Sequence, residues 1–584
     1  MNEHLYRWRN RQLREHVAVI DGHLAPTKIL KQATYLNVFL KKWLTTNIWI
    51  YEDRIVYVGD DLPEHIPSST ESTEVINCQG QYLVPGYVEP HAHPFQLYNP
   101  HSLAEYALKT GTTTLVNDNL MWLLLLNQKK AFSLLDEMQN IPVSMFWWAR
   151  FSSQSELREE AEFIGDEEVL KWLNHEAVIQ GGELTNWPDI LQEDERGLYW
   201  MQETKRLRKV VEGHFPGASR KTLTKMKLLG ADGDHESISG DELYRRLELG
   251  YYAAIRNSSI RPDLRKILQD LKEMDLNVWD YVLYTTDGST PSFYEEGIIN
   301  KCIEIAIEEG VPVEDAYAMA TINPATYFSL EHRLGSIAPG RVAHINFLKS
   351  KEDPTPVSVL AKGEWAVKDG VTSSLTSSID WNEFNLTKMT LDWELESDEL
   401  RFSMPIGMEM VNDVIMKPYP IKSEADTNML ARSQNEAYVM LIDRDGEWRV
   451  STFLKGFTKR LGGLVSSYSN TGDIILIGKS KRDMSLAFKR MQELGGGIVL
   501  AHAGEIIFEL PLEIKGVMTD APMEKLIEQE KEMKKILQDF GYAHSDPVYT
   551  LLFLSSTHLP YIRITPVGIM DVMKKDILFP AIMR

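Results

Sequence analysis

Two histidines, His91 and His93, stand one residue apart at the end of the apolar stretch "YLVPGYVEPHAH". Residues i and i+2 of an extended strand point to the same side, so both imidazoles can reach one metal ion. Neutral imidazole is a ligand of Zn, Fe and Mn. A single His-x-His pair also fits a purely structural role. Whether the pair binds a metal therefore depends on which other ligand-type residues the chain contains.

Ligand-type side chains recur where later apolar stretches end. "EAVIQGGELTN" contains Glu183, "KVVEGH" ends at His214, "ADGDHES" contains His235 and "YVLYTTDGS" contains Asp287. Each has an ordinary alternative role, for example a helix cap or a turn residue. Their order along the chain favours a metal site over unrelated structural roles, because a glutamate among imidazoles can bridge two ions. We therefore predict a two-metal hydrolytic site.

The elements that must position these residues alternate between strands and amphipathic helices over residues 85–330. Such repeated βα units predict a (β/α)8 barrel, whose active site lies at the C-terminal ends of the strands. A doubly wound open sheet is the alternative, but no Gly-rich dinucleotide fingerprint follows the first strand. The eight predicted strands span residues 82–90, 112–118, 142–149, 176–183, 209–214, 227–233, 251–257 and 281–288.

The segments outside the predicted barrel have different sequence patterns. Residues 1–30 predict a polar helical arm. Short alternating strands at 31–84 and 331–371 predict a small β-sandwich unit built from both flanks of the barrel. The Ser/Thr-rich segment 372–389 predicts a linker. Residues 390–584 predict a separate C-terminal α+β domain.

Composition limits the partners. The chain has 584 residues, and 62 basic against 84 acidic side chains give a net charge of −22. This excess of negative charge disfavours nucleic acid and anionic membranes as partners, so we expect a small-molecule substrate. The two cysteines and the absence of an apolar leader predict the cytoplasm. The apolar run 121–126 is too short to span a membrane. The oligomeric state stays open, a homodimer included.

Several motifs resemble, in order, those of the bacterial adenine deaminase family in the amidohydrolase superfamily. They are "VPGYVEPHAH", "GTTTLVND", "GGELTNWPD", "VVEGHFPG", "GADGDHES" and "LGGGIVLAHAGEIIFELPLEIKGVMTD". The resemblance runs from about residue 30 to the end. It implies two divalent ions, Mn or Fe with Zn as an alternative, held in a binuclear site. The implied ligands are His91, His93 and Asp287 for the first ion, His214 and His235 for the second, and Glu183 as the bridge.

The family reaction is the hydrolysis of adenine to hypoxanthine and ammonia. The resemblance implies that a metal-bound hydroxide attacks C6 of the purine and that Asp287 carries the proton toward the leaving amine. Glu236, beside His235, is a candidate for orienting the ligands. Arg256 is predicted either to anchor the substrate or to form a salt bridge inside the barrel mouth.

The chain also departs from the family pattern at polar positions near the ligands. Apolar, small or uncharged residues replace acids and histidines, so these departures concern recognition of the substrate and leave the predicted metal ligands in place. The alternatives are an amidohydrolase for another amino-heterocycle or cyclic amide, or a non-catalytic member of the fold. The departing positions are Phe95, Leu120, Met121, Asn257, Gly288, Ser469 and Gly472.

Overall fold

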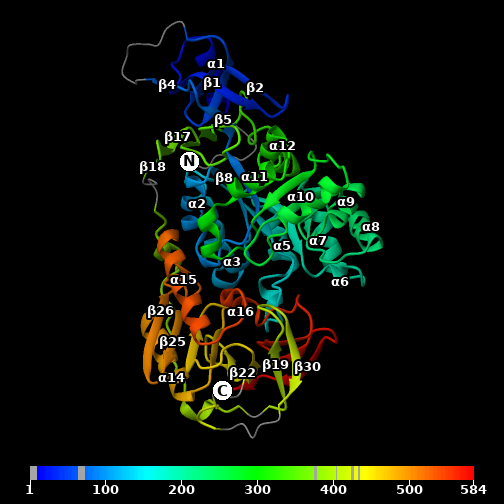
Figure 1. Cartoon of the computed structure of the whole chain (residues 1–584), viewed down its shortest axis with the longest axis vertical. Helices are drawn as coiled ribbons and strands as arrows, with labels where there is room; N and C mark the ends of the chain where they lie inside the picture. The colour runs from blue at the N-terminus through cyan, green and yellow to red at the C-terminus, as the bar shows by residue number, and fades with distance from the viewer. Residues whose placement is uncertain (1–8, 64–72, 374–377, 403, 422–426, 432–434) are drawn as a thin grey trace.

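The structure is a computed structural model that describes residues 9–63, 73–373, 378–402, 404–421, 427–431 and 435–584. Figure 1 shows an elongated molecule with an N-terminal β unit at one end, a barrel in the middle and the C-terminal domain at the other end. The barrel therefore has a neighbour at each end. Among the described residues, every helix is too short or too polar to cross a bilayer.

Eight parallel strands form the barrel and follow one another in chain order. A parallel bridge between Ala92 and Asp287 brings the last strand back to the first, which closes the barrel. This confirms the predicted (β/α)8 architecture. The strands are β6 (Tyr87–Ala92), β8 (Thr112–Asn117), β9 (Ser144–Ala149), β10 (Val178–Leu184), β11 (Val210–Gly213), β12 (Gly233–Asp234), β13 (Tyr252–Arg256) and β14 (Val282–Thr285).

The strands are buried along nearly their whole length because helices cover the outside of the barrel. Apolar residues at helical spacing face the strands, for example Leu264, Ile267, Leu268 and Leu271. The covering helices are α2 (Pro100–Lys109), α3 (Leu120–Leu125), α4 (Gln128–Met138), α5 (Asp166–Asn174), α7 (Glu195–Arg206), α8 (Arg220–Leu229), α9 (Gly240–Glu248), α10 (Leu264–Glu273) and α11 (Ile299–Glu308).

The sixth strand is shorter than predicted. Residues 227–229 end helix α8, which Ser219 caps by accepting from Thr222 N and which Gly230 ends with φ +115°. Leu228 is 82% exposed, so it is not part of the barrel core. The prediction of a strand over 227–233 was therefore wrong, and only Gly233 and Asp234 pair as β12.

The N-terminal β unit is drawn from both sides of the barrel, as predicted. Strand β15 pairs antiparallel with β5 and so joins the two chain segments. Helix α1 (Asn10–Ile20) packs here through Val19, which clusters with Trp49; residues 1–8 of the predicted arm lie outside the described residues. The main strands are β1 (Lys28–Asn37), β2 (Lys42–Tyr51), β3 (Arg54–Gly59), β5 (Tyr82–Pro85), β15 (Ile345–Leu348), β16 (Ser358–Ala361) and β17 (Glu364–Lys368).

The C-terminal domain is a mixed sheet with helices α14 (Lys481–Leu494), α15 (Met523–Asp539) and α16 (Pro547–Phe553). It joins the barrel directly, since β27 (Met518–Thr519) pairs with β7 (Leu97–Tyr98) just after His93. The sheet strands are β19 (Ile406–Met410), β20 (Met416–Pro420), β21 (Glu436–Ile442), β22 (Trp448–Lys455), β23 (Gly463–Ser466), β24 (Ile474–Gly478), β25 (Gly497–His502) and β26 (Glu505–Pro511).

The segment predicted as a linker also touches the barrel. Trp381 is buried, stacks on Trp122 with ring centroids 6.5 Å apart, and donates from Nε1 to Asp520. Residues 374–377 lie outside the described residues. The domain boundaries remain a prediction.

Candidate metal centre

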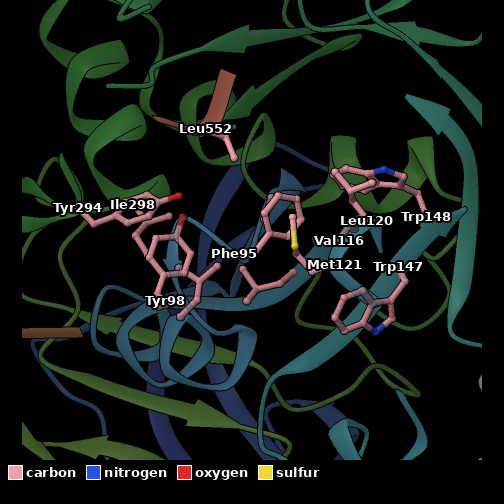
Figure 2. Packing of buried hydrophobic residues seen from close by; sticks show 14 of the residues in the cluster. Phe95, Tyr98, Val116, Leu120, Met121, Trp147, Trp148, Tyr294, Ile298 and Leu552 are labelled. Carbon is pink, nitrogen blue, oxygen red and sulfur yellow. The ribbon is translucent and has the colours of Figure 1, made fainter. Parts of the chain in front are cut away.

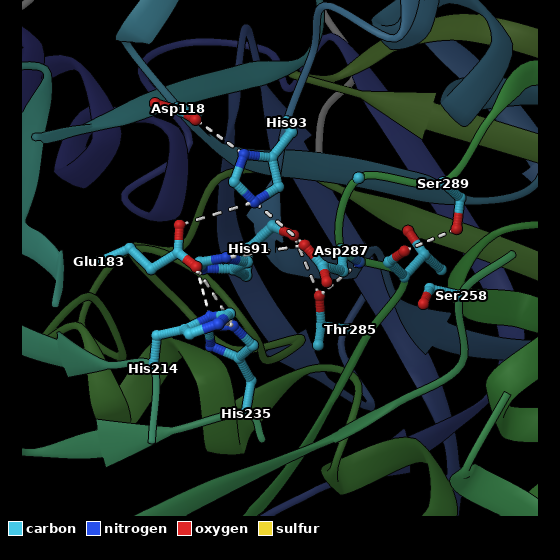
Figure 3. A network of polar contacts seen from close by, with 12 residues as sticks. His91, His93, Asp118, Glu183, His214, His235, Ser258, Thr285, Asp287 and Ser289 are labelled. Atoms are coloured by element: carbon cyan, nitrogen blue, oxygen red, sulfur yellow. Dashed lines mark hydrogen bonds and ion pairs between the residues drawn. The ribbon is translucent and has the colours of Figure 1, made fainter. Parts of the chain in front are cut away.

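The six predicted ligands meet at the C-terminal end of the barrel (Figure 3). Two groups of donor atoms each lie within 4.8 Å of one another. The first group is His91, His93 and Glu183; the second is Glu183, His214 and His235. The carboxylate of Glu183 belongs to both groups, which is the arrangement that a bridging ligand requires.

The two oxygens of Glu183 face different partners. Its Oε1 lies 2.6 Å from His214 Nδ1 and 3.6 Å from His235 Nε2, whereas Oε2 lies 3.9 Å from His93 Nε2. Burial raises the pKa of this carboxyl, but His214, His235 and Arg150 outweigh burial and hold it well below its usual value. Glu183 is therefore an anion placed between two sets of imidazoles.

Asp287 completes the first group. Its Oδ1 lies 3.0 Å from His93 Nε2 and 3.9 Å from His91 Nε2. Both ring nitrogens of His91 are buried and have no hydrogen-bond partner among the described residues. Burying an imidazole nitrogen without a partner costs free energy, and a divalent cation would accept its lone pair. This donor set therefore fits a bound metal.

A buried ion pair orients His93 from behind. Its Nδ1 lies 2.7 Å from Asp118 Oδ2, and Arg150 forms an ion pair with the same carboxylate. Burial lowers the pKa of His93, but Asp118 and Asp287 raise it to about 9. Burial raises the pKa of Asp118, but Arg150 and His93 lower it to about 2. Because Asp118 holds Nδ1, the other ring nitrogen of His93, Nε2, points at the other ligands.

A carboxylate also orients His235. Its Nδ1 lies 3.3 Å from Glu212 Oε1, and Tyr327 donates to the other oxygen of that carboxylate. Burial, the largest influence, raises the pKa of Glu212. Sequence reasoning missed four supporting residues: Asp118, Arg150, Glu212 and Tyr327. The signals were present for two of them, since Asp118 directly follows the second strand and Arg150 the third.

Arg256 lies between two carboxylates. Its Nη1 is 2.5 Å from Glu236 Oε1 and 2.7 Å from Asp287 Oδ2, and Arg261 pairs with the other oxygen of Glu236. Burial raises the pKa of Glu236, but Arg256 lowers it to about 2. Burial likewise raises the pKa of Asp287, but Arg256 and His93 bring it well below its usual value. Both carboxylates are therefore ionised, and Arg256 links them.

Comparisons with known proteins place this site in a family. Residues 82–366 match the amidohydrolase family, and residues 414–576 match the adenine deaminase C-terminal domain. A "putative adenine deaminase" of Oceanobacillus iheyensis is 54% identical over 99% of both chains. Similar proteins of Halalkalibacterium halodurans and Bacillus subtilis are 53% and 50% identical, each over the full length of both chains.

The chain belongs to the adenine deaminase family of the amidohydrolase superfamily. This confirms the resemblance read from the motifs. The family match also accounts for the C-terminal domain, whose matched residues follow the barrel and its β unit in the chain.

Three departures from the adenine deaminase pattern pack in one apolar cluster. Phe95, Leu120 and Met121 are each at most 4% exposed and belong to the same buried core as Trp148 and Leu552 of helix α16 (Figure 2). The ring of Phe95 lies 5.9 Å from that of His93. The wall beside His93 therefore includes the apolar ring of Phe95, which belongs to a buried core that helix α16 of the C-terminal domain shares.

The other departures have structural roles. A Cβ on Gly288 would lie 2.9 Å from Gln96 Nε2 and 3.2 Å from His93 Cβ, so any side chain there requires Gln96 and His93 to shift. Ser469 Oγ donates to Asp473 O, and Gly472 adopts φ +77°, which favours glycine. At Asn257 the backbone N–H donates to Thr285 O, a bond that does not depend on the side chain.

A cavity of about 690 Å³, within the range of small-molecule sites, reaches the ligands through Gln154 and His558, which line it; the six ligands themselves are not part of its wall. Its walls include the loops after β9 and β10 and, from the C-terminal domain, residues 557–560, 572, 573 and 575. His558 lines it, and its ring lies 6.0 Å from that of His214. Burial, followed by His214, lowers the pKa of His558 to about 3. Sequence reasoning left His558 unmentioned.

Proposed function

We propose that this chain hydrolyses adenine to hypoxanthine and ammonia with two divalent ions in the barrel mouth. The observation that carries the proposal is Glu183, which presents one oxygen to each of two imidazole groups in a member of the adenine deaminase family. The three relatives above, which match nearly the whole chain, carry the name "putative adenine deaminase".

In this proposal His91, His93 and Asp287 would hold the first ion, His214 and His235 would hold the second, and Glu183 would contribute to both. Nitrogen and oxygen donors of this kind suit Mn or Fe, with Zn as the alternative. Bound divalent ions supply a nucleophile by lowering the pKa of water from 15.7 to about 7.

The side chains of the site then handle the protons. Asp287, kept ionised by Arg256 and His93, accepts a proton from the attacking water and passes it to the amino nitrogen. The C6–O bond forms, the C6–N bond breaks and ammonia leaves. Glu236, held by Arg256 and Arg261, keeps Arg256 aimed at Asp287.

Metal analysis with an adenine assay tests this proposal. Protein reconstituted with Mn or Fe is expected to bind two ions and to form hypoxanthine and ammonia in equal amounts. Glu183→Ala is expected to lose both ions and all turnover, while Glu314→Ala, at a carboxylate that accepts from Trp43 outside the site, is expected to keep both. Glu183→Ala protein that retains two ions and full activity would contradict the proposal.

A second candidate is another amino-heterocycle, favoured by the apolar wall of Phe95, Leu120 and Met121. An ammonia-release screen over aminopurines, pterins and cyclic amides separates the two. A substrate with a much higher kcat/KM than adenine would replace adenine while leaving the metal assignment intact.

A further inference from the structure

We propose that Gln154 and His558 form a substrate-positioning pair, supplied by the barrel and the C-terminal domain, that binds ring nitrogens of an amino-purine. The inference rests on the proposed function and extends it by naming the groups that hold the heterocycle. Both residues line the 690 Å³ cavity, and each is in contact with a predicted metal ligand.

Gln154 faces the bridging carboxylate. Its Nε2 donates to Glu183 Oε2 at 3.4 Å, and the residue is 9% exposed. Its backbone has φ +63°, a left-handed conformation that a residue other than glycine adopts at a cost. Such a conformation persists only where the surroundings enforce it, and it is typical of functional sites.

The C-terminal domain enforces that conformation. Thr557 N donates to Gln154 O at 2.8 Å, and Ser155 Oγ donates to Ser555 O at 2.7 Å. The loop after β9 is therefore fixed to residues 555–557, immediately before His558. One short segment thus holds Gln154 in place and carries the second member of the pair.

The ring of His558 packs edge-on against His214 at 6.0 Å and against Phe553 at 5.7 Å. Its Nδ1 is buried and has no hydrogen-bond partner among the described residues. A buried imidazole nitrogen without a partner costs free energy, and rotation of the His558 ring toward the cavity that it lines would let a ligand pair with this nitrogen.

The chemistry of the pair matches a purine edge. The Gln154 amide offers two N–H donors and one acceptor, and a neutral imidazole offers one donor and one acceptor. A purine carries ring nitrogens that accept and one N–H that donates. A site that pairs such groups discriminates against rings that lack them. The pair therefore selects an aminated heterocycle with several ring nitrogens over a carbocyclic amine.

The test uses Gln154→Gly, His558→Ala and His558→Gln in the full-length metal-loaded protein. Each of the first two is expected to lower kcat/KM for adenine by about 10- to 100-fold, mainly through KM, with two ions retained. Gln154→Gly is expected to leave Tm unchanged or higher, because glycine adopts positive φ freely. His558→Gln is expected to recover part of the loss, since an amide can replace the ring nitrogen.

Two matched variants serve as controls. His502→Ala removes a histidine that packs on Phe540 within the C-terminal domain, and Gln128→Ala removes an amide that donates to Glu168 O away from the cavity. Both are expected to stay within twofold of the wild type. Values of kcat/KM within twofold for Gln154→Gly and His558→Ala overturn the inference, as does loss of metal in parallel with activity.

Calorimetric binding of adenine separates this inference from the proposed reaction. Wild-type protein that binds adenine but does not deaminate it would refute the reaction alone; weaker binding by both variants then still supports the pair. Unchanged binding in the variants overturns the pair whatever the turnover. Wild-type protein that does not bind adenine overturns both.

Discussion

Asp118→Asn and Glu212→Gln perturb the two halves of the metal centre separately. Asp118 lies 2.7 Å from His93 Nδ1 and is held ionised by Arg150, whereas Glu212 lies 3.3 Å from His235 and has a raised pKa owing to burial. Carboxylates behind ligating histidines contribute about 10- to 100-fold to metal affinity, or about 1.4–2.7 kcal/mol. We expect Asp118→Asn near the upper value and Glu212→Gln near the lower one.

The assay is competition with a chelator, read by elemental analysis and by the magnetic coupling of paired Mn ions. Asp118→Asn is expected to empty the site of His91 and His93 first, and Glu212→Gln the site of His235. Among the described residues Asp118→Asn also leaves the buried Arg150 with Glu183, 3.4 Å away, as its ion-pair partner, so Tm is expected to fall.

Asp280→Asn is the control, since Asp280 forms a largely exposed pair with Lys41 and is expected to leave both affinities unchanged. Equal affinities in the wild type and in both site variants would refute the reasoning that these carboxylates orient the ligands.

Three further predictions concern packing and protonation. Gly288→Ala is expected to push against Gln96 and His93 and lower kcat at least about 10-fold with the fold retained, as judged by circular dichroism and turnover. Burial raises the pKa of Asp473 from 3.8 to about 7, so its contribution to stability is complete below about pH 4 and is lost as the pH rises through 7. Asp473→Asn should therefore raise Tm at pH 8 but not at pH 4; an equal change at both values would argue against this. Burial raises the pKa of Cys78 to about 12, so a thiol reagent at pH 8 is expected to label it only after unfolding, and rapid labelling of the folded protein would contradict the burial.

The ligand residues could be predicted from the sequence because local rules govern them. Alternation along a strand puts His91 and His93 on one side, and the strand ends of a barrel converge. The sixth strand was mispredicted because the apolar pair Leu228 and Leu229 ends an amphipathic helix, and only the cap at Ser219 and the turn at Gly230 reveal this.

The residues that orient the metal ligands depend on contacts that no local sequence pattern encodes. Asp118 meets His93 because β8 lies beside β6 in the barrel, and Arg150 joins them from the next strand. His558 reaches His214 across 344 positions of the chain, through a loop that docks on the barrel. Such contacts follow from tertiary packing, which the sequence pattern alone does not reveal.

The most direct test of the central claim measures metal content and adenine turnover in the same sample. Protein titrated with Mn or Fe is expected to gain activity only as the second ion binds, reaching two ions per chain at full turnover, with one hypoxanthine and one ammonia formed per adenine consumed. Protein that holds two ions and leaves adenine unchanged would contradict the account of the reaction. Protein that turns over adenine with no bound metal would contradict the account of the site.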